Sequence, residues 1–125
     1  MNFNQAKYLV ILSMTFLFYS CSSKVEAIFE ITNSINQNIQ NLTMQPDENK
    51  NNHISVETQS KATLKTNMTN LPKIDGSYYL SFKSNDTFRG LNFGYYTNCY
   101  PSESITRIDI QSDTIIIKSE YNKNY

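Results

Sequence analysis

The chain has 125 residues, with 11 basic and 11 acidic side chains and a formal net charge of zero. Without a basic excess it lacks the electrostatic footprint of a nucleic-acid-binding protein, so we expect no nucleic-acid partner. Once a short apolar head is set aside, the remaining length holds one small domain at most.

The first element is an apolar run, Tyr8–Tyr19, which follows Lys7 and contains no charged residue and no proline. About a dozen residues are too few to cross a bilayer, which needs about 20, but this length is typical of the hydrophobic region of an export signal. Removing the head takes away Lys7 and leaves the rest of the chain with one excess negative charge.

The end of this run resembles a bacterial lipobox, with the small residue Ser20 directly before Cys21. Its loose form is similar to the lipoboxes of Bacteroidetes lipoproteins. The resemblance implies a signal peptide over 1–20, cleavage between Ser20 and Cys21, and a diacylglyceryl group on the Cys21 thiol. Several acyl chains would anchor the protein far more firmly than one myristoyl chain. We expect a membrane-anchored envelope protein, at the outer membrane or its periplasmic face. The alternatives are secretion after cleavage near Ser23, or an uncleaved anchor.

The chain contains only two cysteines. If Cys21 is acylated, Cys99 has no partner within the chain. We expect Cys99 to be buried beside Tyr96 and Tyr100, with pairing between two chains as the alternative. The only histidine, His53, lies in the most polar stretch, so a Cys99–His53 nucleophilic pair is not expected. The sequence shows no metal-ligand spacing and no cofactor motif, and we predict no catalytic residues, no metal and no cofactor.

Residues 21–45 are interpreted as a lipidated N-terminus followed by an amphipathic helix that ends before Pro46. Apolar residues recur there every three or four positions, and Asn and Gln fill the opposite face. This helix could cover a sheet, pair with another chain or lie near the membrane. The apolar positions are Val25, Ile28, Ile31 or Thr32, Ile35, Ile39 and Leu42.

Residues 46–73 are rich in Asn, Lys, Thr and Ser, and their apolar residues are scattered. Burying so few apolar side chains would not offset the conformational entropy lost on ordering the backbone, about 1–2 kcal/mol per residue. We therefore predict a polar linker, with one short strand at Ile54–Thr58.

Residues 74–118 carry the pattern of a small antiparallel β-domain. Apolar and polar side chains alternate over 77–83, with Tyr78, Leu80 and Phe82 on one face, as in a half-buried strand. Together with the preceding segments, this pattern predicts a mainly β protein with an N-terminal helix (α+β). Its small antiparallel sheet follows a signal peptide, the helix and the polar linker.

A turn at Ser84-Asn85-Asp86 leads into the next predicted strand, in which we expect Gly90 to form a bulge. Beyond this glycine, Leu91, Phe93 and Tyr95 alternate on the apolar face.

Ile108 and Ile110 lead through a turn at 111–113 into the strand 114–118, which predicts a hairpin. The last strand is nearly all β-branched, so we expect it to be central or well covered rather than an exposed edge. A polar tail, 119–125, follows.

The order of these features over 77–118 resembles the opening half of a META-type β-domain, and small lipocalin-like lipoproteins share its rhythm. The resemblance rests on Thr87-Phe88-Arg89-Gly90 and on the aromatic stretch 92–96. It implies antiparallel β-structure, and we transfer no functional residue from it. The second half of such a domain would lie beyond Tyr125. The open sheet edges would then be covered by the helix or by a second chain, unless the protein is a truncated remnant.

Seven of the nine tyrosines follow residue 74. Tyrosine suits strands, which is the plain interpretation, but it is also enriched at interfaces. The candidate binding face is Tyr78, Tyr95, Tyr96 and Tyr100.

The predicted function is that of a small lipid-anchored envelope protein with a non-catalytic binding or envelope-maintenance role. Its expected partners are the membrane, through the N-terminal lipid, an unidentified protein or small molecule, and a second copy through the sheet edges. The alternatives are a secreted, unanchored binding or inhibitor module that uses the tyrosine-rich face, or a remnant of a larger lipoprotein.

Overall fold

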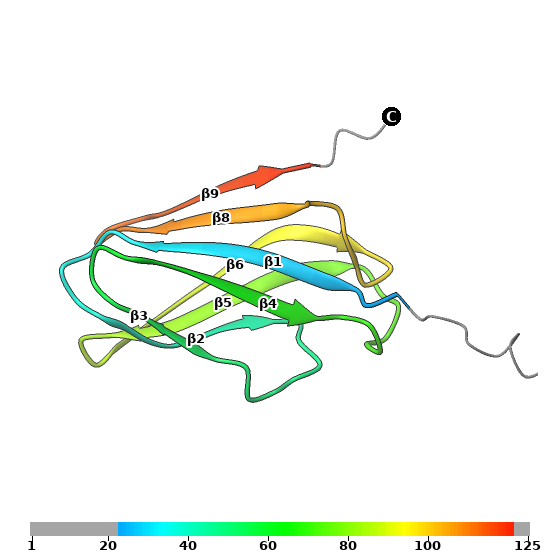
Figure 1. The fold of residues 1–125 in the computed structure, drawn as a ribbon, viewed down its shortest axis with the longest axis horizontal. Coiled ribbons are helices and arrows are strands. Elements are labelled where there is room, and N and C mark those ends of the chain that lie inside the picture. The colour runs from blue at the N-terminus through cyan, green and yellow to red at the C-terminus, as the bar shows by residue number, and fades with distance from the viewer. Residues whose placement is uncertain (1–22, 122–125) are drawn as a thin grey trace, which may run out of the picture.

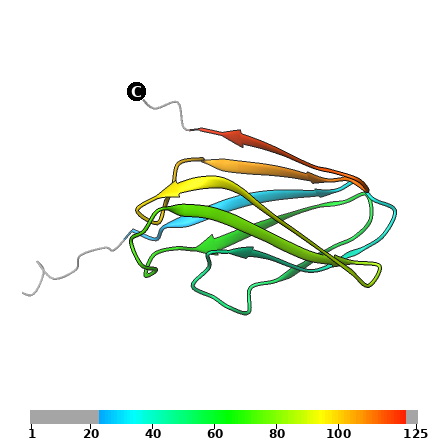
Figure 2. The same cartoon turned by 180° about the vertical axis from the view of Figure 1, so that it is seen from behind.

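The computed structural model describes residues 23–121, which form two sheets facing each other as a β-sandwich (Figures 1 and 2). One sheet has the strand order β4-β1-β8-β9 and the other has the order β3-β2-β5-β6-β7. Neighbouring strands are antiparallel, except that β1 and β8 are parallel. The strands are β1 (Glu26–Asn33), β2 (Ile39–Gln45), β3 (Ile54–Val56), β4 (Lys61–Asn67), β5 (Gly76–Ser84), β6 (Thr87–Thr97), β7 (Tyr100–Pro101), β8 (Ile105–Ile110) and β9 (Ile115–Glu120).

The mainly β prediction is confirmed, but the helix predicted over 25–45 is wrong. This segment forms β1 and β2, joined by a loop at 34–38, and residues 23–121 contain no helix, hence none that could span a membrane. Along β1 the buried residues alternate with half-buried ones, and Phe29 and Ile31 lie in the core. β1 forms hydrogen-bonded ladders on both sides, to β4 and to β8. These pairings with distant parts of the chain override the weak helical spacing.

The polar linker predicted over 46–73 contains two strands. The short strand predicted at Ile54–Thr58 is confirmed as β3, whereas β4 was not predicted. In β4, Leu64 and Thr66 face the core while the lysines of the strand point outward. The inward residues are few and one of them is polar, so the segment resembles a linker when it is considered without its partner β1.

The predicted strands of 74–118 are present, but they are divided between the sheets: β5 and β6 belong to one sheet, and β8 and β9 to the other. Tyr78, Leu80 and Phe82 are buried, as their alternation predicts. Asn85 and Asp86 both have positive φ, the two-residue turn that suits a twisted hairpin.

The bulge predicted at Gly90 lies elsewhere in β6. Gly90 keeps the regular register with β5, and the register shifts at Gly94, where φ is +63°. The shift turns Tyr95 outward and Tyr96 into the core, which corrects the predicted alternation. Gly90 instead leaves room for the side chain of Tyr79, because a Cβ there would overlap the Tyr79 hydroxyl oxygen.

The isoleucine-rich strand β9 is an edge strand, contrary to the prediction. The hairpin that leads to it is confirmed: the Gln111 N–H donates to the Thr114 carbonyl oxygen at 2.9 Å. Ile115 and Ile117 are half-buried against the core, whereas Ile116 points outward and is 41% exposed. Within residues 23–121, β9 pairs with β8 alone, which leaves its second ladder of backbone groups open in this part of the chain.

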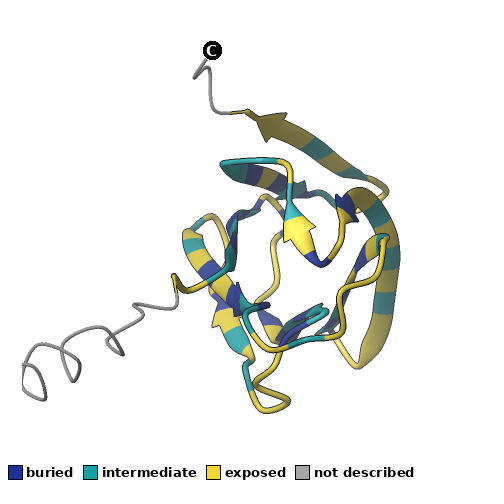
Figure 3. Cartoon of the chain, turned by 90° about the vertical axis from the view of Figure 1, so that its right-hand side faces the viewer, coloured by how far each residue is buried: buried dark blue, intermediate teal, exposed yellow. Residues whose placement is uncertain are grey.

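The core fills the space between the sheets, and Figure 3 shows buried positions on strands of both. Three aromatic rings form its centre, with ring centroids 5.1 Å apart for Phe29 and Tyr78, and 5.6 Å apart for Tyr78 and Phe93. Such edge and tilted contacts are favourable beyond the area they bury.

The sandwich has two ends. At the near end β1 begins, β4 ends, β5 begins and β6 ends, as the pairing registers require. The far end carries the loop 34–38 and the turns at 57–60, 85–86 and 111–114. The near end lies at the right in Figure 1 and faces the viewer in Figure 3.

Asn33, at the far end of β1, is a fully buried polar residue that ties the two sheets together. Its Nδ2 donates to the carbonyl oxygens of Gln37, Val56 and Glu57 at 2.8, 3.0 and 3.1 Å. Its Oδ1 accepts from the Ile35 N–H at 3.1 Å. One side chain therefore contacts four backbone groups, with its two N–H hydrogens shared among three carbonyl oxygens, where the chain passes from β3 of one sheet to β4 of the other.

Asp47 joins the two sheets on the same long side of the sandwich, closer to the near end. Its Oδ1 accepts from the backbone N–H groups of Asn49 and Asn67 at 2.9 and 3.1 Å. Its Oδ2 accepts from Asn52 Nδ2 at 2.7 Å, and the same Nδ2 donates to the Lys65 carbonyl oxygen at 2.8 Å. The loop after β2 is thereby fastened to β4 of the opposite sheet.

Candidate functional site

The four tyrosines predicted as a binding face do not share one surface. Tyr78 and Tyr96 are buried in the core, whereas Tyr95 and Tyr100 are 54% and 61% exposed. Burial, and then the negative charge of Glu103, raise the pKa of Tyr78, so its hydroxyl stays neutral. Of these four tyrosines, only Tyr95 and Tyr100 are exposed enough to contact a partner.

Cys99 is a buried free thiol, as predicted, and its Sγ lies 3.9 Å from the Met68 carbonyl oxygen. His53 is exposed and directly precedes β3. β3 and β7 are the opposite edges of their sheet, and Cys99 directly precedes β7. The structure therefore does not bring the only histidine and this cysteine together as a nucleophilic pair.

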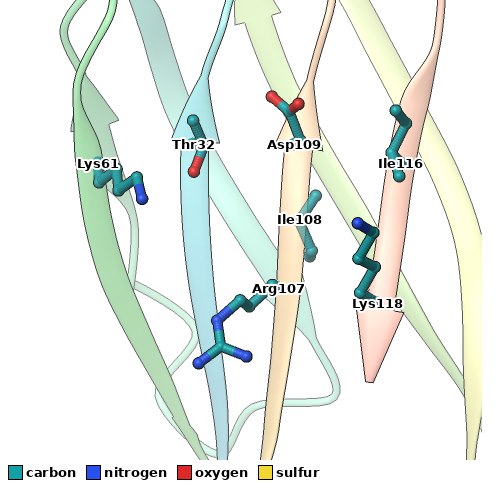
Figure 4. A pocket seen from close by; sticks show the side chains of 7 residues that line it. All are labelled: Thr32, Lys61, Arg107, Ile108, Asp109, Ile116 and Lys118. Carbon is teal, nitrogen blue, oxygen red and sulfur yellow. The ribbon is translucent and has the colours of Figure 1, made fainter. Parts of the chain in front are cut away.

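The outer face of the four-stranded sheet carries a shallow hollow of about 320 Å³ (Figure 4). All four strands of this sheet contribute to it, because alternate residues of each strand point outward. The side chains that line it are Thr32, Lys61, Arg107, Ile108, Asp109, Ile116 and Lys118.

Ion pairs hold Arg107 in this hollow, and hydrogen bonds hold Asp109. Arg107 contacts Glu30 on β1, with an Nε–Oε2 distance of 3.5 Å, and pairs with Glu120 on β9. Hydrogen bonds from Ser34 and Gln111, with smaller contributions from nearby lysines, lower the pKa of Asp109. Asp109 is therefore ionised at neutral pH and is poorly suited to act as a general acid.

Counted with the carboxylates that pair with Arg107, the hollow holds three positive and three negative groups. Lys61 and Lys118 are exposed, and Figure 4 shows them on the two outer strands of the sheet. The sum favours neither an anionic nor a cationic ligand. This face is best described as a solvated network of charges.

A second hollow, of about 370 Å³, lies among the loops of the far end. Arg89 is its only charged residue, and its guanidinium donates to the Gln111 carbonyl oxygen at 2.7 Å. The remaining groups are mostly uncharged amides and hydroxyls, which suit a polar, uncharged ligand. The side chains that line it are Ile35, Asn36, Gln37, Ser84, Asn85, Thr87, Arg89 and Ser112.

Sequence reasoning missed three structural side chains: Asn33, Asp47 and Arg89. Asn33 occupies an inward position in the alternation of Ala27, Phe29 and Ile31, and that alternation was the signal that could have identified it. Asp47 and Arg89 carry no comparable signal, since their partners are backbone groups of other strands and turns. Among residues 23–121, no group of three or more His, Cys, Asp or Glu side chains could hold a metal ion.

No family model, no curated protein and no solved structure matches this chain. The resemblance to a META-type domain therefore stays a prediction, and the range that carries it is divided between two sheets. Ser20 and Cys21 lie outside the described residues, so the signal peptide, the cleavage site and the lipidation stay predictions too.

Proposed function

We propose that this chain is a small lipid-anchored envelope protein with a non-catalytic binding role, attached to the membrane through acylated Cys21. The observation that carries the proposal is the uncharged apolar run that ends at Ser20-Cys21. The sandwich starts soon after this run. The Val25 N–H donates to Thr69 Oγ1 at 3.0 Å, and the Val25 carbonyl oxygen accepts from the Met68 N–H at 2.8 Å. Cleavage after Ser20 would leave every strand of the sandwich intact, because the first begins at Glu26.

The binding role is supported by the hollow among the far-end loops. Its lining residues come from three separate connections and from the adjoining ends of β5 and β6, which the sandwich holds together. β1 begins at the opposite end, so an anchor that precedes β1 leaves these loops pointing away from the attachment point. The ligand class that fits the lining is polar and uncharged.

The experiment is metabolic labelling with palmitate and fractionation of cells that express the full chain. The wild type should be labelled and should sediment with membranes, whereas Cys21→Ser should lose the label and become soluble. Cys99→Ala is the matched control, because it removes the other, buried cysteine and should leave labelling unchanged. A Cys21→Ser protein that stays membrane-bound and unprocessed would contradict the proposal in favour of an uncleaved anchor. Wild-type protein recovered unlabelled from the medium would support a secreted module.

A further inference from the structure

Exposed apolar side chains gather at the near end of the sandwich. Ile74 is 61% exposed, as is Tyr100, and Tyr95 is 54% exposed. We call these three residues the apolar tip. Single exposed apolar residues are ordinary on protein surfaces, but these three lie at one end of the sandwich, on the loop before β5, at the end of β6 and in β7, and form a local patch.

Contacts between two loops hold the apolar tip together. The Cys99 N–H donates to the Ile74 carbonyl oxygen at 2.8 Å, and the Asn98 N–H donates to Asp75 Oδ1 at 2.7 Å. Asp75 also raises the pKa of the Tyr95 hydroxyl through a side-chain hydrogen bond. The loop between β4 and β5 and the turn between β6 and β7 therefore form one surface.

The apolar tip lies where the chain from Cys21 enters the sandwich. Val25 forms backbone hydrogen bonds with Met68 and with the Thr69 side chain. The Met68 carbonyl oxygen lies 3.9 Å from the Sγ of Cys99, the residue directly before Tyr100. Four peptide steps join Cys21 to Val25, so the anchor point lies within about 14 Å of Val25 even when the chain is fully extended. A lipid on Cys21 would therefore keep the near end close to the bilayer.

We propose that the apolar tip rests in the headgroup region of the bilayer that holds the lipid anchor, so that the sandwich has one fixed orientation on the membrane. The proposal rests on the acylation of Cys21 proposed above. Tyrosine suits this region because its ring is apolar and its hydroxyl is polar. The charges beside Ile74 are one cation, Lys73, and one anion, Asp75, so contact should not require anionic lipid.

Tryptophan fluorescence tests the orientation, because the chain contains no tryptophan. The full chain is expressed with its anchor, purified and reconstituted in phosphatidylcholine vesicles with brominated acyl chains. Tyr100→Trp should lose about half of its emission to bromine, since an interfacial ring lies within reach of the upper acyl carbons. Phe88→Trp is the matched control: Phe88 is also exposed, at 74%, but follows the far-end turn and should not be quenched.

Ile74→Trp provides a second probe, in case Tyr100→Trp lowers the urea midpoint. Adding anionic phosphatidylglycerol to the vesicles should leave the quenching unchanged. Equal quenching at the two ends, or none at either, in a protein whose mass shows acylated Cys21 would overturn the orientation alone. A mass that shows unmodified Cys21 would overturn the lipid anchor, and the orientation with it.

Discussion

The two long sides of the sandwich are closed by different means. On the side of β3 and β4 the chain itself crosses between the sheets, and Asn33 and Asp47 fasten the crossing from within. On the side of β6 and β9 a hollow of about 490 Å³ lies between the starts of these two strands. Arg89 bridges this second side through hydrogen bonds to the β8–β9 turn.

The difference shows that a few short polar side chains can close a sandwich when they satisfy buried backbone groups. Each hydrogen bond adds only about 1 kcal/mol, but a buried backbone group left without a partner costs about 1–3 kcal/mol. We therefore expect substitutions on the β3–β4 side to cost more than those on the β6–β9 side.

The largest effect is expected for Asn33→Ala. The substitution leaves the carbonyl oxygens of Val56 and Glu57 without this donor inside the protein. The free energy of unfolding should fall by roughly 2–4 kcal/mol, measured from urea denaturation. Asn36→Ala, an exposed substitution in the adjoining loop, should leave the midpoint unchanged. Equal midpoints for the two variants would show that Asn33 does not close this side.

Asp47→Asn should have the second-largest effect. It places an amide where Asp47 Oδ2 now accepts from Asn52, so two donors face each other. We expect a loss of about 2 kcal/mol of unfolding free energy, since hydrogen bonds to charged groups are worth about 1.5–3 kcal/mol. Glu48→Gln is the matched control: the side chain of this neighbouring acid accepts a hydrogen bond from Asn70 at the surface, and the variant should behave as wild type. A larger loss in Glu48→Gln than in Asp47→Asn would refute this role.

On the β6–β9 side, Arg89→Met should cost about 1 kcal/mol, because it removes partly exposed hydrogen bonds and the cation–π contact with Phe82. The guanidinium carbon lies 5.3 Å from the centre of that ring. Lys83→Met serves as the control, since Lys83 contacts only its own hairpin, at Asp86 and Phe88. Hydrogen exchange should speed up in the β8–β9 turn of Arg89→Met and not in that of Lys83→Met. Unchanged exchange there would mean that Arg89 does not bridge the sheets.

The smallest effect is expected for Ile116→Ala, on the edge strand β9. Ile116 points away from the core, so its truncation should change the unfolding free energy by less than about 0.5 kcal/mol. Ile117→Ala should cost more, because Ile117 packs against the core and pairs with Ile108. The isoleucine-rich strand was predicted to be covered, and equal, large losses in both variants would revive that prediction.

Sequence reasoning succeeded where strands are joined by tight turns. The hairpins β5–β6 and β8–β9 have alternating or β-branched sequences on both sides of a short turn, so the local pattern contains most of the pairing. It failed over β1 and β4, whose mutual pairing spans a long stretch of chain and whose inward positions include Asn33 and Thr66. From the sequence alone, a polar residue at an inward position of a strand suggests a turn or a loop, because its neighbours in the folded protein are not known.

The candidate site shows the same difference between features that the local sequence predicts and features that the folded structure decides. The burial of Cys99 was predicted from the cysteine count. The register shift at Gly94 decides that Tyr95 is exposed and Tyr96 is buried, and no sequence pattern predicted that shift. The tyrosine face was therefore divided between the core and the surface.

Mass spectrometry of the protein extracted from membranes tests the lipid anchor most directly. The account predicts a chain that begins at Cys21, has lost residues 1–20, and carries the mass of a diacylglyceryl group and of any further acyl chain on its N-terminal residue. A chain that retains Met1, or one that begins near Ser23 without added mass, would contradict it.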